Sequence, residues 1–303
     1  MKILYSIFLF FVFILRKLPK FLRRGFFKLI AKLAFIFARK TNKIIEANLR
    51  LVYGDKLSKN EIIEIQKYSY FNMVLWVQTL IENLDASDEE IKSHVKMQNE
   101  HILDELLANN EPFILISAHY GNMEMMSTYL NKFKFPINQV ARQSNFKEFD
   151  DFITNAREKS GAKIVYRHGA LKKLVKALIK KEVVSLIIDQ NINPKDGDEV
   201  EFLGVKANQT SSSSSLARKF KVKIVPVAIF NEDDYNYKIK VYEPIVPIIT
   251  ENEQEDLNYL SQAQANALSD IINEDKKQWF WPHKRFKSHF REIYEKNSNI
   301  KWW

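Results

Sequence analysis

The sequence predicts an α/β fold with a mixed, mainly parallel sheet flanked by helices. From residue 111 onward, short apolar runs of strand length alternate with stretches of helical periodicity. That alternation is typical of sheets whose strands are joined by helices packed on the sheet faces. A basic and strongly apolar segment precedes this region. With 303 residues the chain can bury a large core, as one domain or as a domain with an appendage.

The first 43 residues predict a membrane-anchoring helix followed by an interfacial helix. Residues 3–15 are almost wholly apolar, but they are fewer than the roughly 20 residues that a spanning helix needs. Residues 16–43 interleave apolar side chains with Lys and Arg at helical spacing, which predicts a helix lying among lipid headgroups. The alternative is an ordinary amphipathic helix packed on the body of the protein.

The charge of the chain is concentrated beside this apolar segment. Residues 1–50 contain twelve Lys or Arg and one acidic residue, whereas residues 51–303 contain 34 basic and 36 acidic residues. A nucleic-acid-binding protein more often spreads basic surface over its folded domain, so we expect no nucleic-acid partner. We expect instead a membrane surface with anionic lipid, on the cytoplasmic side. The chain is therefore divided into an anchor at 1–43 and a main domain at 44–303.

Local patterns predict the remaining elements in chain order. Capping boxes at Ser58 with Glu61 and at Ser87 with Glu90 predict two helix starts, the first helix ending near residue 83. Apolar runs predict strands at 113–117, 137–141, 163–166, 183–188, 222–229 and 235–242. Helical periodicity predicts helices at 122–131, 146–159, 169–181 and about 254–275. The serine run at 211–215 predicts a helix N-terminus that either faces a ligand or is only capped by a serine.

A candidate catalytic group follows the first predicted strand of this region. Strand 113–117 is succeeded by His119, by Gly121 and Asn122, and by Glu124. On one unbroken helix the His119 and Glu124 side chains would lie about 140° apart around the axis. We therefore predict that a turn at Gly121-Asn122 interrupts the helix so that the two side chains meet. The alternative is a strand-end histidine bonded to backbone, with Glu124 on a solvated face.

Polar residues also follow the other predicted strands. In open α/β sheets the active crevice lies at the carboxyl ends of the strands. Those ends are followed by Arg142, by residues 166–168 and by residues 189–191, and Arg157 lies on an intervening helix. A base together with carboxylates and arginines suits proton abstraction from an alcohol and stabilisation of an oxyanion. Acyl transfer requires both.

Other chemistries are excluded or not indicated. The chain has no cysteine, which excludes disulfides, thiolate metal sites and a cysteine nucleophile. It offers no glycine-rich phosphate loop and no serine nucleophile elbow. His283 and His289 would lie on different faces of a helix, so we expect no metal there, and we expect no cofactor.

The motifs form an ordered set. His119 and Glu124 match His-x4-Asp/Glu, and matches follow at Arg142, Arg157, 189–191, 200–204, Ala207, Thr210, 225–227 and 279–287. This set resembles the bacterial late acyltransferases of lipid A biosynthesis, the lauroyl and myristoyl acyltransferases, within the glycerolipid acyltransferase superfamily. The resemblance covers the whole chain. Two departures are the serine run where relatives usually have a glycine, and residues 231–233 where an arginine is expected.

The resemblance implies the reaction and the partners. His119 would act as general base on a hydroxyl of a lipid A precursor of the Kdo-lipid IVA type, with Glu124 fixing its tautomer. The alkoxide would attack an acyl-acyl carrier protein thioester directly, without cofactor or acyl-enzyme. The site would lie at the cytoplasmic face of the bacterial inner membrane. The implied substrate-binding residues are Gly121, Asn122, Arg142, Arg157, Asp189, Gln190, Asn191 and Thr210.

Individual roles remain open among these residues. Arg142 or Arg157 would stabilise the oxyanion or hold a phosphate, and Asp189 belongs to the site without a role. The acidic carrier protein would be steered by five lysines, which otherwise form a solvated helix face: Lys172, Lys173, Lys176, Lys180 and Lys181. One rival is an acyltransferase for another glycolipid or lysophospholipid, such as a mannosylated phosphatidylinositol. The other is a non-catalytic lipid-binding membrane protein.

Overall fold

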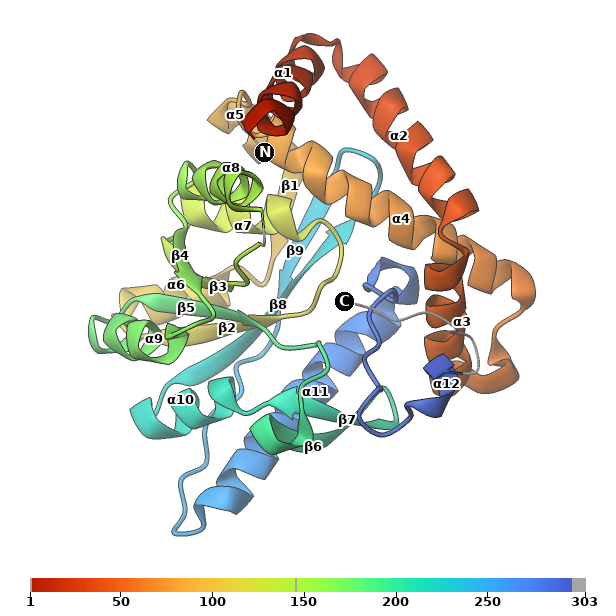
Figure 1. The fold of residues 1–303 in the computed structure, drawn as a ribbon. Coiled ribbons are helices and arrows are strands. Elements are labelled where there is room, and N and C mark those ends of the chain that lie inside the picture. The colour runs from red at the N-terminus through yellow and green to blue at the C-terminus, as the bar shows by residue number, and fades with distance from the viewer. Residues whose placement is uncertain (1, 145, 296–303) are drawn as a thin grey trace.

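A seven-stranded sheet forms the centre of the computed structural model, which describes residues 2–144 and 146–295 (Figure 1). The strand order is β1-β9-β8-β2-β5-β3-β4, and every neighbouring pair is parallel except β9 with β8. The predicted mixed, mainly parallel sheet is thus confirmed. The strands of this sheet are β1 (Val95–Gln98), β2 (Phe113–Ser117), β3 (Ile137–Ala141), β4 (Lys163–Tyr166), β5 (Val183–Ile187), β8 (Lys223–Asn231) and β9 (Tyr237–Val241).

Helices cover both faces of this sheet. The α-helices of the described residues are α1 (Lys2–Lys17), α2 (Lys20–Phe37), α3 (Arg39–Tyr53), α4 (Lys59–Glu82), α5 (Asp88–His94), α6 (His101–Ala108), α7 (Met123–Phe133), α8 (Lys147–Glu158), α9 (Ala170–Ile179), α10 (Ser212–Phe220), α11 (Glu253–Glu274) and α12 (Glu292–Glu295). Three single 3-10 turns lie at Gly54–Lys56, Pro194–Asp196 and Lys276–Gln278. The predicted helices in 122–181 and 254–275 are therefore present.

Strand β2 shows why the sheet is buried on both sides. All five of its residues are buried, as expected for a central parallel strand with a continuous apolar sequence. Because successive side chains point to opposite faces, Ile114 and Ile116 pack in one hydrophobic cluster with α9, α10 and α11. Phe113 and Leu115 pack in the other cluster with α6 and α7. The strand that leads to His119 is thus fixed from both faces.

The structure differs from the sequence-based prediction in several elements. The helical segment predicted for 16–43 is two helices that meet at Ala38, and the boundary between 43 and 44 falls inside α3. The short strand β1 was not predicted. Neither was the antiparallel hairpin of β6 (Gly197–Phe202) and β7 (Val205–Thr210), which forms a separate two-stranded sheet.

The N-terminal helices pack on the body by one face only. Phe27 and Ala31 of α2 are buried, and Val12 and Leu15 of α1 form a small cluster with Phe27 and Ile81. Many other apolar side chains of α1 and α2 are exposed. Within residues 2–144 and 146–295, no helix combines the length and the apolar character needed to cross a membrane.

Candidate active site

The turn between β2 and α7 requires glycine at position 121. Gly121 has φ +53°, a left-handed conformation, and a Cβ atom there would lie 1.9 Å from the carbonyl oxygen of Ile229. Asn122 caps α7 by accepting a hydrogen bond from Met125 N. The helix begins only at Met123, so His119 precedes it and the predicted interruption is confirmed.

His119 is bonded to Asp189. Its Nδ1 lies 2.8 Å from Asp189 Oδ1, and its backbone N–H donates to Asp189 Oδ2 at 2.9 Å. The network therefore assigns the proton to Nδ1 and leaves Nε2 as an acceptor. The His119 side chain is 20% exposed and that of Asp189 is 3% exposed. A buried carboxylate thus holds a partly accessible imidazole in the tautomer that a general base needs.

Strand register brings these two residues together. Ser117 at the end of β2 is paired with Ile187 at the end of β5. Because the strands are parallel, residues two positions beyond this pair, His119 and Asp189, leave the sheet side by side. The pairing of His119 with a carboxylate 70 residues away follows from this register.

The two charges affect each other's pKa. Burial lowers the pKa of His119, but the charge of Asp189 and the hydrogen bond to it outweigh burial and raise that pKa above its usual value. Burial raises the pKa of Asp189, and the charge of His119 with the hydrogen bonds from His119 and Trp279 lower it to about 2. Asp189 therefore stays ionised at neutral pH and favours the imidazolium that forms during proton transfer.

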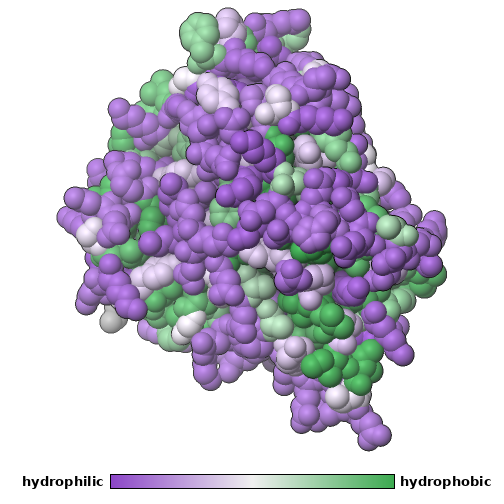
Figure 2. Space-filling view, turned by 180° about the vertical axis from the view of Figure 1, so that it is seen from behind, coloured by the Kyte–Doolittle hydropathy of each residue, from purple (hydrophilic) through white to green (hydrophobic). Residues whose placement is uncertain are grey.

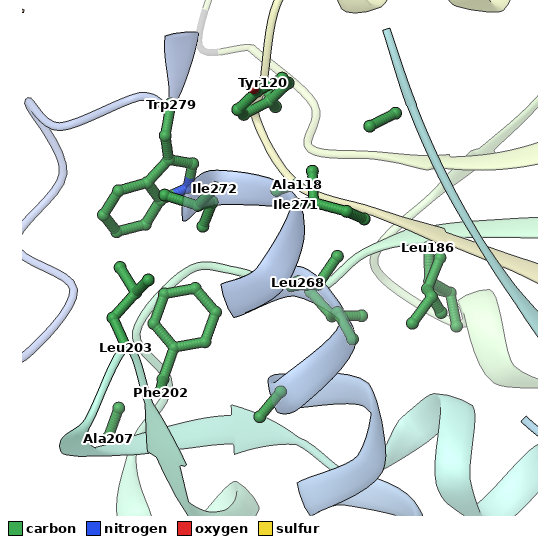
Figure 3. Close-up of a cluster of buried hydrophobic side chains, with 14 of the residues drawn as sticks. Ala118, Tyr120, Leu186, Phe202, Leu203, Ala207, Leu268, Ile271, Ile272 and Trp279 are labelled. Atoms are coloured by element: carbon green, nitrogen blue, oxygen red, sulfur yellow. The ribbon is translucent and has the colours of Figure 1, made fainter. Parts of the chain in front are cut away.

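A C-terminal segment, residues 279–288, holds the loop that follows β5. Trp279 Nε1 donates to Asp189 Oδ2 at 2.7 Å, and the Trp279 ring lies among Ile272, Leu203 and Phe202 in the core (Figure 3). The resemblance includes residues 279–287 in its motif set without giving them this role. Its Trp279 indole both anchors the segment and fixes Asp189.

Two more residues of this segment form hydrogen bonds with the same loop. Burial lowers the pKa of His283 to about 4, so its ring is neutral, and Nε2 accepts a hydrogen bond from Asn191 N at 2.9 Å. The fully buried Arg285 donates from Nη1 to Gln190 O at 3.0 Å. Residues 281–290 are not helical, contrary to the expectation for His283 and His289.

Glu124 forms no hydrogen bond with His119, and this corrects the predicted dyad. Its carboxylate accepts two hydrogen bonds from Arg157, with Nε to Oε2 at 3.0 Å and Nη2 to Oε1. Asp189 is the hydrogen-bond partner of His119 Nδ1 because β5, which Asp189 follows, is paired with β2. Glu124 lies instead in the first turn of α7. Glu124 and Arg157 nevertheless line the same cavity as His119.

Aromatic side chains surround the imidazole. The ring centroids of Trp76 and Phe280 lie 6.3 Å and 6.0 Å from that of His119, and Trp76 Nε1 donates to Gly121 O at 2.7 Å. Trp76 belongs to α4 and is half-buried. Its ring lies beside the imidazole, and its hydrogen bond to Gly121 O supports the turn.

A cavity of about 310 Å³ extends from His119 between α7, α8 and the sheet. Apolar groups of β2, α7 and β3 line its deeper part, among them Leu115, Leu130 and Ile137. Charged groups line the part near the strand ends: His119, Glu124, Arg142, Asp150 and Arg157. Apolar depth beside a charged rim suits an acyl chain with a reactive carbonyl near His119.

The remaining predicted site residues are placed as follows. Arg142 is exposed and lines the cavity. Gln190 Nε2 lies 3.4 Å from His119 Nε2, and Asn191 accepts from Ser288 Oγ at 3.0 Å. Asn122 is fully buried and donates to Thr79 Oγ1 at 2.8 Å, so it builds the turn. Thr210 bonds Ser212 Oγ at the start of α10 and does not line the cavity.

The serines at 212–215 start a helix, as predicted. Ser213 and Ser214 are fully buried and bonded to Gln264 and Ser261 of α11. In the described part of the chain no three His, Asp or Glu side chains are grouped to hold a metal ion. The chemistry that this site offers is proton abstraction by His119 next to an apolar cavity with a charged rim.

Comparisons with known proteins identify the family. The crystal structure of the 1-acyl-sn-glycerophosphate acyltransferase PlsC from Thermotoga maritima is similar over 84% of this chain and 99% of that one, with 15% identity and a TM-score of 0.40. Comparison with the curated proteins found no match. The model of a family described as bacterial lipid A biosynthesis acyltransferase matches residues 1–288. That match spans nearly the whole chain, which therefore belongs to the bacterial lipid A biosynthesis acyltransferase family.

Proposed function

We propose that this acyltransferase moves a fatty acyl chain from an acyl carrier protein thioester to a hydroxyl of a lipid A precursor of the Kdo-lipid IVA type. The family supports an acyl donor and a lipid acceptor. The observation that carries the proposed mechanism is the bond between His119 Nδ1 and Asp189, which leaves Nε2 as an acceptor at the cavity, with Gln190 Nε2 3.4 Å away.

The proposed reaction is direct transfer. Nε2 of His119 takes the proton of the acceptor hydroxyl as its oxygen attacks the thioester carbonyl. The tetrahedral oxyanion collapses, the carbon–sulfur bond breaks, and the departing thiolate takes the proton from the imidazolium. A thioester is already activated, so no acyl-enzyme is required.

The arginines are proposed to divide two tasks. Arg157 is held by Glu124 and is close enough to His119 for its charge to lower the pKa of that histidine. A fixed guanidinium in this position would stabilise the oxyanion. Arg142 has an exposed side chain at the rim of the cavity, so we assign it to a phosphate of the acceptor.

The acceptor can be tested directly. Purified protein supplied with an acyl-acyl carrier protein is expected to add the mass of one acyl chain to a lipid A precursor. Mass spectrometry of the reaction products measures this gain. A parallel incubation with lysophosphatidic acid should give no product. Acylation of lysophosphatidic acid but not of the lipid A precursor would contradict the proposed acceptor.

The N-terminal helices are proposed to attach the enzyme to the cytoplasmic face of the inner membrane. Side chains of α1 and α2 are exposed beside a net positive charge, among them Phe10 at 65%, Phe13 at 53% and Phe21 at 70%. The side of the molecule seen in Figure 2 is mainly hydrophilic, with apolar residues in separate patches, so it offers no continuous apolar face. Phe8 of α1 packs edge-on against Phe149 and Phe152 of α8, the helix that bears Arg157.

Replacing Phe10 and Phe13 by serine tests this attachment. Both side chains are exposed, so the fold should be kept while apolar area available to lipid is lost. Binding to vesicles that contain anionic lipid is expected to fall about tenfold or more, as measured by co-sedimentation. Unchanged binding by this variant would contradict the proposed membrane face.

A further inference from the structure

One concentration of positive charge outside the N-terminal helices lies on α9 and the strand before it. Residues 163–181 contain seven Lys or Arg and no acidic residue, although residues 51–303 as a whole have two more acidic than basic residues. Leu174, Ala177 and Leu178 form the buried face of α9. The five lysines Lys172, Lys173, Lys176, Lys180 and Lys181 are all exposed.

In the part of the chain that the structure describes, the five lysines are not neutralised by ion pairs. Among the ion pairs of the described residues none involves the five lysines, whereas Lys132, Lys134 and Lys240 are each paired. An unneutralised basic helix face attracts an acidic partner and steers its approach. Leu171, which is 58% exposed, supplies an apolar contact in the midst of this charge.

The basic face continues into the active site through a second depression. It has a volume of about 420 Å³ and is lined by Arg142, Gln143, Tyr166, Arg167, His168 and Gly169. Arg142 also lines the cavity that contains His119. The depression thus lies between α9 and the catalytic cavity, at the carboxyl ends of β3 and β4.

We propose that α9 and this depression dock the acyl carrier protein, with the lysines on its acidic surface and Arg167 on the phosphodiester of its prosthetic arm. This inference rests on the proposed carrier-protein donor and adds the surface that receives it. The thioester at the end of the arm would then enter beside Arg142 and reach His119.

A carrier protein fits this face better than a membrane does. Figure 1 places α9 at the lower left, well separated from α1 and α2 at the top and right, whose exposed apolar side chains are proposed to meet the bilayer. On α9 only Leu171 and Ile179 are exposed large hydrophobic side chains. A charged helix with little apolar area suits electrostatic docking of a soluble acidic protein.

Charge reversal with two kinds of donor tests the proposal. In Lys172→Glu/Lys173→Glu, KM for an acyl-acyl carrier protein is expected to rise about tenfold or more, with a weaker dependence on salt. Turnover of the acyl-pantetheine thioester, which lacks the protein, should stay within about twofold, because neither lysine lines the catalytic cavity. The matched control is Lys56→Glu/Lys59→Glu near the start of α4, which makes the same charge change on two exposed lysines.

A second variant tests the phosphate contact. Wild-type protein is expected to use acyl-4′-phosphopantetheine better than acyl-pantetheine, and Arg167→Gln should abolish this preference.

An unchanged KM for the carrier-bound donor in the Lys172→Glu/Lys173→Glu variant would overturn the docking surface. Equal losses with both donors would also overturn it, as would an equal effect of the control. A fall in vesicle binding with an unchanged carrier KM would assign α9 to the membrane instead. If the wild-type protein used none of these thioesters, the proposed function itself would fail, and the docking surface with it.

Discussion

Replacing His119 by alanine is expected to lower kcat/KM for acyl transfer by about 10³- to 10⁴-fold. His119 is the group at the cavity whose Nε2 is oriented to accept a proton, because Nδ1 is bonded to Asp189. The loss should appear in kcat as well as in kcat/KM, since proton removal from the hydroxyl occurs in the transition state. Steady-state rates with a fixed thioester donor measure it.

A second substitution separates chemistry from folding. Alanine leaves the buried Asp189 carboxylate without one of its donors, which lowers stability as well. In His119→Asn the amide nitrogen can take the place of Nδ1 and donate to Asp189, so thermal stability should be largely kept. Activity should be lost all the same. Substantial activity in His119→Asn would contradict His119 as the base.

Replacing Asp189 by asparagine is expected to lower kcat/KM by about 10²- to 10⁴-fold. Asp189 Oδ2 accepts from both the backbone N–H of His119 and the indole of Trp279, at 2.9 Å and 2.7 Å. An asparagine would keep its oxygen at those two donors and turn its NH₂ group toward Nδ1. The imidazole proton would then move to Nε2, which could no longer accept a proton. Glu124→Gln leaves the Asp189 contacts intact, so it should keep the His119 tautomer even though it weakens the hold on Arg157.

The pH dependence follows from the same pair. Against the effect of burial, Asp189 raises the pKa of His119 above its usual value. A base must be neutral, so kcat/KM is expected to rise with pH through this raised pKa. Without the carboxylate the imidazolium loses its stabilising charge, so in Asp189→Asn the rising limb should move to lower pH. If the rising limb of the kcat/KM profile lay at the same pH in Asp189→Asn as in the wild-type protein, Asp189 would not set the pKa of His119.

Much of the fold could be predicted from local sequence. Strand β2 and its neighbours are short apolar runs, and the start of α4 has both hydrogen bonds of the predicted capping box between Ser58 and Glu61. The sequence of the β6–β7 hairpin lacks the turn residues by which such hairpins are usually predicted. Its turn places Leu203 at φ 52° and Gly204 at φ 76°, whereas asparagine or aspartate is the residue expected before the glycine.

The candidate site could be predicted only in part. His119 and the turn at Gly121 follow from a strand that ends beside a glycine, and both are found as expected. The partner of His119 depends on strand order, which local patterns do not contain. Glu124 is close in sequence, but Asp189 is brought beside His119 by the pairing of β5 with β2. The contacts of Trp279, His283 and Arg285 with the same loop depend on how the chain closes after α11.

Nitrogen NMR of the His119 ring tests most directly the central claim, that Asp189 rather than Glu124 holds the base in its active tautomer. The wild-type protein and Glu124→Gln are both expected to show a protonated, hydrogen-bonded Nδ1 and an unprotonated Nε2 at a pH where the ring is neutral. In Asp189→Asn the proton should be found on Nε2. A tautomer that changes in Glu124→Gln and persists in Asp189→Asn would contradict the account.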